Sequence, residues 1–430
     1  MHKGRSNAAF FFLSFPVSNW RWEVVPGKPS ASLHPVWRKR HPPVHEATGG
    51  HGFSRHHLPT PLRRVLGNYC YIRGMEQKAE RVYFLDYLRV IALFLVLVVH
   101  ASETFYGDKI LVANQDVRLW LGIWDGIARV SVPLFMVCSA YLLAPLREDQ
   151  SWGEFFRRRA KRILPPMFIF FVLYSILPVL WGASTWPEAW RAIAYIPLNF
   201  PHAAGHLWFM YPLIGLYLFI PFISPWLRVA KERQERLFLI LWALSTCLPY
   251  INRWVGEVWG QCWWNQYDML YYFAGYPGYL IMAHYIKTHI HWDDAKRRAV
   301  GLACLLVGAV ATILSFYLQI VPGTEQSVVD MEIGWCFCTI NCVVYTFGAF
   351  LLFTTIHKPG KGYKLVYDIS KVSYGMFLIH MFWLWLLAPV ITPLMHISLA
   401  IPCIALATYI VSYLSCKLIS LIPGSRWVIG

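Results

Sequence analysis

The sequence predicts an all-α polytopic membrane protein with about ten transmembrane helices and with both termini in the cytoplasm. Its 430 residues are 57% hydrophobic and 14% charged, whereas a soluble domain carries about 25% charged residues. The 21 Trp, 24 Tyr and 27 Phe are typical of a chain with aromatic belts at the two membrane interfaces. Apolar runs that alternate with basic loops complete the pattern.

Apolar segments near the length of a membrane span, about 20 residues, recur from residue 82 onward. The fifth segment is short and only TPLMHIS separates the last two, so the pattern is compatible with nine to eleven spans. The ten predicted helices cover residues 83–106, 119–144, 163–181, 206–227, 237–252, 269–286, 299–320, 335–356, 373–394 and 398–422.

The charges in the loops predict the topology. The loops at 145–162, 228–236, 287–298 and 357–371 contain 18 Lys and Arg, whereas the alternate loops contain 3. Because Lys and Arg are enriched on the cytoplasmic side, the first helix is expected to run from the cytoplasm outward. This asymmetry and the basic N-terminal segment explain most of the formal net charge of +16, so a nucleic-acid-binding surface is not indicated.

The N-terminal segment differs from the rest of the chain. Residues 1–74 contain 11 Lys and Arg, 2 Asp and Glu, and much Pro and Gly, without helical or strand periodicity. This composition is typical of a disordered tail. We interpret the segment either as a basic cytoplasmic tail or as sequence upstream of a natural start at Met75. Residues 75–430 form the predicted transmembrane domain.

The first predicted helix carries four ionisable residues within FLDYLRVIALFLVLVVHASETFYG: Asp86, Arg89, His100 and Glu103. At about 100° per residue they share a sector of about 100°. Ionisable groups inside a membrane usually face a partner or a cavity, so the sequence predicts a polar seam along this helix. The alternative is an interfacial Asp86–Arg89 ion pair and a packed core histidine at position 100.

Other predicted helices carry polar residues as well. Asp125 and Arg129 form an i,i+4 pair in the second helix, where Pro133 allows a kink. Arg159 and Arg162, in EFFRRRAKRILPP, lie one helical turn apart and are suited to an anion such as phosphate, although positive-inside anchoring also explains this run. His206 and Trp208 in GHLWFMYPLIG, at the outer end of the fourth predicted helix, and His380 in SYGMFLIHMFW, within the ninth, are further candidates. Single histidines at such places are more often packed than catalytic.

These motifs together resemble the acyltransferase 3 family, whose members are multi-spanning membrane O-acyltransferases, largely of bacteria. LDYLRVIALFLVLVVH places ten residues between Arg89 and His100, and it is followed in order by ARVSVPLFMVCSAYLL, RRAKR, HLWFMYPLIGLYL and SYGMFLIH. The resemblance covers residues 82–422 and is greatest to the branch that O-acetylates surface glycans. One departure is Ser139-Ala140-Tyr141, where the family usually has S-G-(Y/F).

The resemblance implies an acyltransferase of the bacterial inner membrane. His100 would act as general base toward a sugar hydroxyl, or would carry an acyl group or a proton within the membrane. Glu103 would orient its imidazole, and Arg89 would stabilise the thioester oxygen or bind the donor. The co-substrate would be cytoplasmic acyl-CoA, with acetyl-CoA expected, held through its phosphates by Arg159 and Arg162. No bound cofactor and no metal are expected. The supporting residues would be Asp86, Asp125, Arg129, His206, Trp208 and His380.

The implied acceptor is a hydroxyl of a surface or secreted glycan, or of its lipid-linked precursor. Membrane lipid and other polysaccharide-synthesis proteins are the further partners, and nucleic acid is not among them. The competing interpretation is a proton-coupled or glycan-precursor transporter, because buried Arg, His and Asp side chains also line transport paths. The sequence contains no obvious inverted repeat of the kind that many transporters have.

Overall fold

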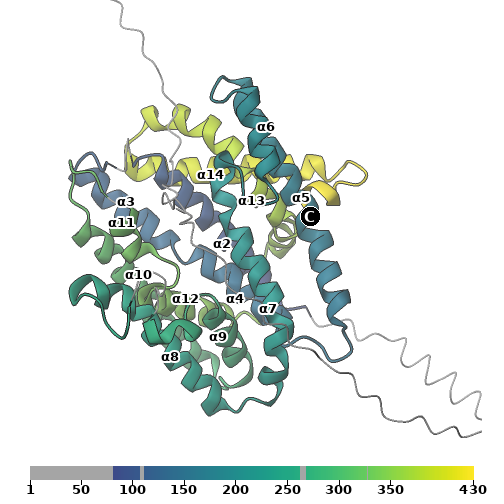
Figure 1. Ribbon diagram of the computed structural model, residues 1–430, viewed down its shortest axis with the longest axis vertical. Coiled ribbons are helices and arrows are strands. Elements are labelled where there is room, and N and C mark those ends of the chain that lie inside the picture. The colour runs from purple at the N-terminus through teal and green to yellow at the C-terminus, as the bar shows by residue number, and fades with distance from the viewer. Residues whose placement is uncertain (1–80, 107–110, 262–267, 327) are drawn as a thin grey trace, which may run out of the picture. The chain divides into compact units, whose positions relative to one another are not determined.

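The computed structural model describes residues 81–106, 111–261, 268–326 and 328–430, and most of these are helical. The segment 1–74 and Met75 lie outside them, and the only extended pairing among them is an isolated antiparallel bridge between Leu111 and Glu325. In chain order the elements (Figure 1) are α2 (Tyr83–Glu103), α3 (Gln115–Ala128), α4 (Ser131–Leu143), α5 (Trp152–Leu180), α6 (Trp186–Tyr195), η2 (His202–Phe209), α7 (Met210–Val229), α8 (Glu232–Trp254), η3 (Asp268–Phe273), α9 (Pro277–Thr288), α10 (Asp294–Gln319), α11 (Val328–Trp335), α12 (Ile340–Phe353), α13 (Tyr363–Ile391), η4 (Thr392–Leu394), α14 (Ile397–Ile419) and α15 (Arg426–Ile429).

Eight helical segments within the described ranges are long and apolar enough to cross a membrane. This confirms the predicted class, an all-α polytopic membrane protein. The candidate spans are Tyr83–Glu103, Gln115–Leu143, Trp152–Leu180, His202–Val229, Asp294–Gln319, Ile333–Phe353, Tyr363–Leu394 and Ile397–Ile419.

The other two predicted spans correspond to α8 and α9. The 12 residues of α9 extend only about 18 Å, and α8 carries charged residues in its first and last turns. The two helices are antiparallel, because His284 near the end of α9 lies 3.0 Å from the Glu235 carboxylate near the start of α8. If α8 and α9 both cross the membrane, the chain returns to the side from which it started. The predicted side of every loop outside this pair is therefore the same whether the two helices cross or not.

Two helices extend further toward the predicted cytoplasmic side than the hydropathy pattern indicates. Helix α5 begins at Trp152 rather than near residue 163, and its N-cap Ser151 accepts a hydrogen bond from the Glu154 backbone N–H at 3.2 Å. Helix α13 begins at Tyr363 rather than near residue 373. Charged and polar side chains are good or acceptable helix formers outside the hydrocarbon, so the helical segments are longer than their apolar parts.

The predicted second span consists of two helices, α3 and α4, that are separated at Arg129 and Val130. The break lies one turn before Pro133. Proline has no backbone N–H, so it cannot bond the Arg129 carbonyl, which lies four residues earlier. The interruption places Arg129 at the junction of two helices.

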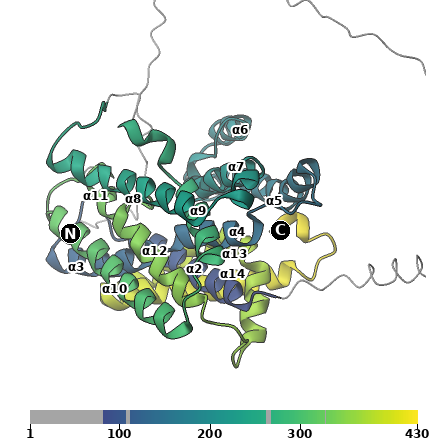
Figure 2. The ribbon, with the colours of Figure 1, turned by 90° about the horizontal axis from the view of Figure 1, so that it is seen from below.

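Helix α2 lies inside the bundle and packs against α3, α4, α13 and α14, an arrangement that can be followed in Figures 1 and 2. Its apolar window is 67% buried, compared with 22% for α10. The helix that carries the predicted polar seam is therefore surrounded by protein, whereas α10 is much less covered. This arrangement gives the polar side chains of α2 protein partners.

Candidate active site

The first turns of α2, on the predicted cytoplasmic side, carry Asp86, a carboxylate that is only 3% exposed. It accepts hydrogen bonds from the Tyr363 hydroxyl at 2.6 Å and from the Ser370 hydroxyl at 2.7 Å. The predicted ion pair with Arg89 is present at 3.5 Å. The shorter bonds come from α13, so Asp86 joins two helices, and these contacts suffice to stabilise a buried carboxylate.

Arg89 lies next to this carboxylate and remains 30% exposed. Its guanidinium also interacts with the thiol of Cys138 on α4. A guanidinium has five N–H donors, and the single 3.5 Å contact with Asp86 is a weak one. The position is therefore compatible with a structural pair and with ligand binding, and the predicted role of Arg89 stays a prediction.

One turn separates His100 from Glu103 at the other end of α2. The His100 Nδ1 atom lies 2.7 Å from Glu103 Oε2, and the two side chains are 12% and 21% exposed. A carboxylate only accepts hydrogen bonds, so Nδ1 carries the proton and Nε2 of a neutral imidazole is left as the basic nitrogen. This is the orientation that a general base requires.

Three histidines from separate elements meet at this point. The ring of His100 on α2 lies 5.2 Å from that of His380 on α13 and 6.1 Å from that of His206 in η2, measured between centroids. The His206 and His380 rings are 5.1 Å apart, and Tyr174 of α5 packs edge-on against His206 at 4.7 Å. The tertiary structure thus brings together three residues that the sequence offers only as isolated histidines.

A buried polar network adjoins the histidines. Arg129 pairs with Asp125 at 2.7 Å, as the i,i+4 spacing predicts, and the Tyr106 hydroxyl donates a hydrogen bond to the same carboxylate. Burial and the Asp125 charge raise the pKa of Tyr106 well above its usual range, so this hydroxyl stays protonated. Arg129 also interacts electrostatically with Glu103, which connects the network to the His100 pair.

Aromatic rings enclose the Arg129 guanidinium. It lies 4.4 Å from the centre of the Trp335 ring, which stacks on Phe316 at 4.1 Å. Trp208 is half-buried and stacks on Phe337 at 5.6 Å, and Phe337 is itself 5.8 Å from Arg129. Trp208 is therefore connected to Arg129 through Phe337.

Arg159 and Arg162 both lie in the first part of α5. Arg159 is half-buried and lies 5.8 Å from the Tyr217 ring, and its Nε has no hydrogen-bond partner within the described ranges. Arg162 is exposed, and the nearby Arg158 adds a third positive charge to the same turns. Like charges that gather in this way attract an anion. The structure therefore brings these arginines together on one helix and leaves them apart from the histidines.

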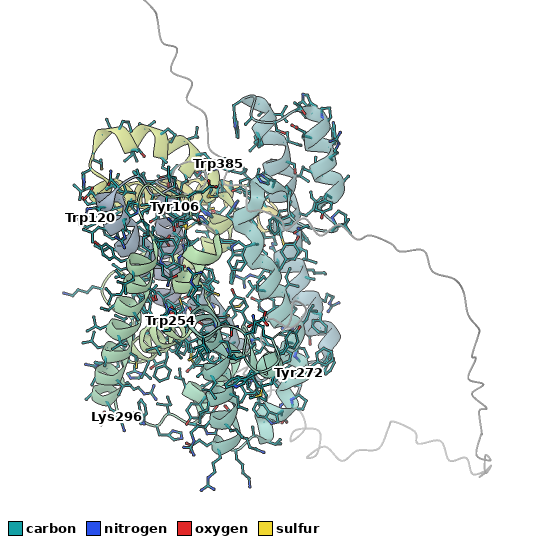
Figure 3. The ribbon with its side chains drawn as sticks, turned by 60° about the vertical axis from the view of Figure 1, so that its left-hand side comes forward. Tyr106, Trp120, Trp254, Tyr272, Lys296 and Trp385 are labelled. Carbon is teal, nitrogen blue, oxygen red and sulfur yellow. The ribbon has the colours of Figure 1, made fainter. Side chains whose placement is uncertain are left out.

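Several site residues were not identified from the sequence. Figure 3 shows Tyr106 inside the bundle, whereas Tyr272 and Lys296 lie at its edge, and Tyr106 is only 6% exposed. Tyr363 and Ser370 are seven positions apart and share a helix face. Once α13 is known to begin at Tyr363, this spacing predicts that both hydroxyls can reach the same partner. Tyr174 and Trp335 carry no such signal, because their partners are distant in sequence.

In the described part of the chain, no group of three or more His, Cys, Asp or Glu side chains could hold a metal ion.

Comparison with protein families gives one informative result: a family model described as an acyltransferase domain matches residues 82–417. Neither the curated proteins nor the solved structures contain a match to the chain. The matched range includes every site residue described above.

Proposed function

The chain belongs to the acyltransferase 3 family, and on this basis we propose that it transfers an acyl group from cytoplasmic acyl-CoA to a hydroxyl of a cell-envelope or extracellular glycan, or of its lipid-linked precursor. It is a membrane acyltransferase by its family and by its apolar helices. Acetyl-CoA is the proposed donor, and the bacterial inner membrane is the proposed location. Membrane lipid and other polysaccharide-synthesis proteins are the proposed partners.

The observation that carries the chemistry is the 2.7 Å contact between His100 and Glu103. The carboxylate fixes the imidazole tautomer and stabilises the imidazolium that forms when the base accepts a proton. Both residues lie in the last turn of α2, which is its predicted outer end, where a glycan acceptor is expected. His100 is therefore the proposed general base, and Glu103 the residue that orients it.

The proposed reaction proceeds by attack of the acceptor oxygen on the thioester carbonyl. His100 Nε2 takes the hydroxyl proton as the new C–O bond forms, and the C–S bond then breaks. The leaving CoA thiolate takes the proton back from the imidazolium, which restores the neutral base. The products are an ester and a free thiol, and no oxidant or reductant is needed.

Arg89 and His100 are too far apart on α2 to act on the same atom of the substrate. They lie eleven positions apart on α2, which corresponds to about 16 Å along the axis. One thioester carbonyl cannot contact both side chains, so we assign Arg89 to donor binding rather than to stabilising the oxyanion. Arg159 and Arg162 are the proposed phosphate contacts, because arginine forks match phosphate geometry.

The test uses His100→Ala and Arg89→Ala in a host whose surface glycan can be analysed. We expect His100→Ala to abolish glycan acylation, since no other base is assigned. Arg89→Ala should raise the KM for acyl-CoA more than it lowers kcat. The matched control is His357→Ala, which removes an exposed histidine that contacts Asp294 on the cytoplasmic side; its acylation should equal that of the unmodified chain.

Unchanged acyl content in both variants, with normal protein levels, would disprove the proposal. A different result would favour the transporter: loss of the secreted glycan itself, while any glycan that remains keeps its acyl groups. Measuring glycan yield and acyl content in the same samples separates these two outcomes.

A further inference from the structure

Two buried ring nitrogens next to His100 lack a hydrogen-bond partner among the described residues. They are Nε2 of His206 and Nε2 of His380, and these side chains are 8% and 0% exposed as residues. Buried polar atoms in proteins are nearly always hydrogen-bonded, because an unpaired one loses its interaction with water. Two such atoms beside a proposed catalytic base indicate polar groups of a substrate.

The hydrogen bonding of His380 defines what its free nitrogen requires. The Nδ1 atom lies 2.7 Å from the Phe377 carbonyl oxygen. A carbonyl only accepts, so Nδ1 carries the hydrogen, and Nε2 of the neutral ring is an acceptor. No described carboxylate pairs with this ring, so a charged imidazolium here would be buried without a counter-charge, which is unfavourable. His380 therefore presents an acceptor atom that needs a donor.

His100 has the same tautomer, but its Nε2 atom is not among the buried nitrogens without a partner in the described residues, and its side chain is 12% exposed. Its Nδ1 donates to Glu103, so its Nε2 is also an acceptor. The two rings are 5.2 Å apart, with 31° between their planes, and they come from α2 and α13. A hydroxyl group has one proton and cannot donate to both nitrogens at once, so a substrate that bonds both nitrogens needs two donors.

We infer that the acceptor presents two neighbouring hydroxyls, as adjacent unsubstituted positions of a sugar ring do, one to His100 and the other to His380. This inference rests on the proposed acyltransfer function. The hydroxyl at His100 loses its proton and becomes the ester, whereas the hydroxyl at His380 keeps its proton and only fixes the orientation of the ring. His380 is thus a positioning residue that selects a vicinal diol.

Two substitutions of His380 separate its two nitrogens. In His380→Asn the amide N–H can still donate to the Phe377 carbonyl, but nothing replaces Nε2. In His380→Gln the longer side chain places an amide oxygen, which is an acceptor, near the position of Nε2. The pair therefore distinguishes the loss of the acceptor atom from a general disturbance of α13.

The assay uses membranes that contain the full chain, acetyl-CoA, and glycan purified from a host that lacks the gene. For His380→Asn we expect kcat/KM for the glycan to fall about tenfold, as for the loss of one hydrogen bond, with an unchanged KM for acetyl-CoA. His380→Gln should recover most of this loss. His357→Asn, on the exposed histidine, is the control and should have no effect. NMR of the native glycan should place each acyl group next to a free hydroxyl.

Four results would overturn the inference. The first is an acylated position with no free neighbouring hydroxyl, a readout that does not depend on how the variants fold. The second is a rise in the KM for acetyl-CoA alone, which would assign Nε2 to an N–H of the donor. The third is wild-type kinetics in His380→Asn, and the fourth is equal loss in the Asn and Gln variants. If wild-type membranes transfer no acetyl group and gene deletion leaves glycan acylation unchanged, the proposed function itself fails and the inference fails with it.

Discussion

At the scale of single residues, every ionisable side chain of α2 has a partner supplied by the protein. Asp86 is bonded by residues of α13, and Arg89 pairs with Asp86. His100 pairs with Glu103, which in turn interacts with Arg129. Charged groups inside a membrane cost several kcal/mol when they lack partners, so these contacts explain how one helix tolerates four of them. They also divide these residues into one pair near the start of α2 and one pair at its end.

The carboxylate of Glu103 can be tested without removing its hydrogen bond. Glu103→Gln keeps an oxygen that accepts from His100 Nδ1 but removes the charge that stabilises the imidazolium. We expect kcat to fall about 10²-fold, within the range for general acid–base catalysis, with little change in the KM for acyl-CoA. Steady-state kinetics in membranes measures both quantities.

The chain contains a suitable control for this substitution. Asp116 lies 2.6 Å from His396 in a pair of which both side chains are more than half exposed. Asp116→Asn should leave kcat unchanged, because an exposed pair of this kind contributes little. If Glu103→Gln and Asp116→Asn changed kcat by the same factor, Glu103 would have no specific role in the reaction.

At the scale of helices, close backbone contact joins α10 to α12. A Cβ atom at Gly348 on α12 would lie 2.6 Å from the Gly301 carbonyl oxygen and would collide with the Leu305 backbone nitrogen, both on α10. These are backbone atoms and cannot move aside as a flexible side chain can. Small residues at such contacts are typical of helix pairs in membranes.

Gly348→Ala is therefore expected to destabilise the folded chain by about 1–3 kcal/mol, as overpacking does. Gly215→Ala on α7 is the matched control, since a Cβ at this position meets no atom within 4 Å. Alanine forms helix better than glycine, so the control should melt at the same or a higher temperature. Thermal unfolding in detergent measures both variants, and equal melting temperatures would contradict the packing argument.

At the scale of the whole molecule, α8 and α9 decide whether the chain crosses the membrane eight or ten times. The start of α8 contacts the end of α9 through Glu235 and His284. Near the end of α8, the Tyr250 hydroxyl lies 3.1 Å from Ser315 late in α10 and 2.9 Å from Asn341 at the start of α12. These contacts place the end of α8 beside the end of α10 and the start of α12, and ten crossings stay a prediction.

Cysteine labelling tests this topology. We expect a membrane-impermeant maleimide to reach Ala183→Cys and Glu257→Cys from the outer face, and Lys361→Cys from the cytoplasmic face. Vesicles of both orientations, compared with the parent chain, provide the measurement. Labelling at positions 257 and 361 from the same face would mean that α8 and α9 do not cross. Labelling at positions 183 and 361 from the same face would overturn the predicted sidedness.

Part of the site could be predicted because it is local. The Asp125–Arg129 and His100–Glu103 pairs lie within one turn of a helix, so their spacing predicts the contacts that the structure contains. The convergence of His206 and His380 on His100 could not be predicted in this way, because three elements separated by more than a hundred residues supply the rings. The extended starts of α5 and α13 were also missed, because hydropathy reports only the apolar part of a helix.

The sequence by itself determined that this protein is a helical membrane protein with basic loops on one side, because hydrophobic length and charge asymmetry are properties of the chain alone. It also placed Arg89 and His100 on one face of one helix. Only the tertiary structure decided which residues surround that face: Ser370 and Tyr363 at one end, and two further histidines at the other. Such contacts depend on how helices pack, and packing brings together positions that no local spacing connects.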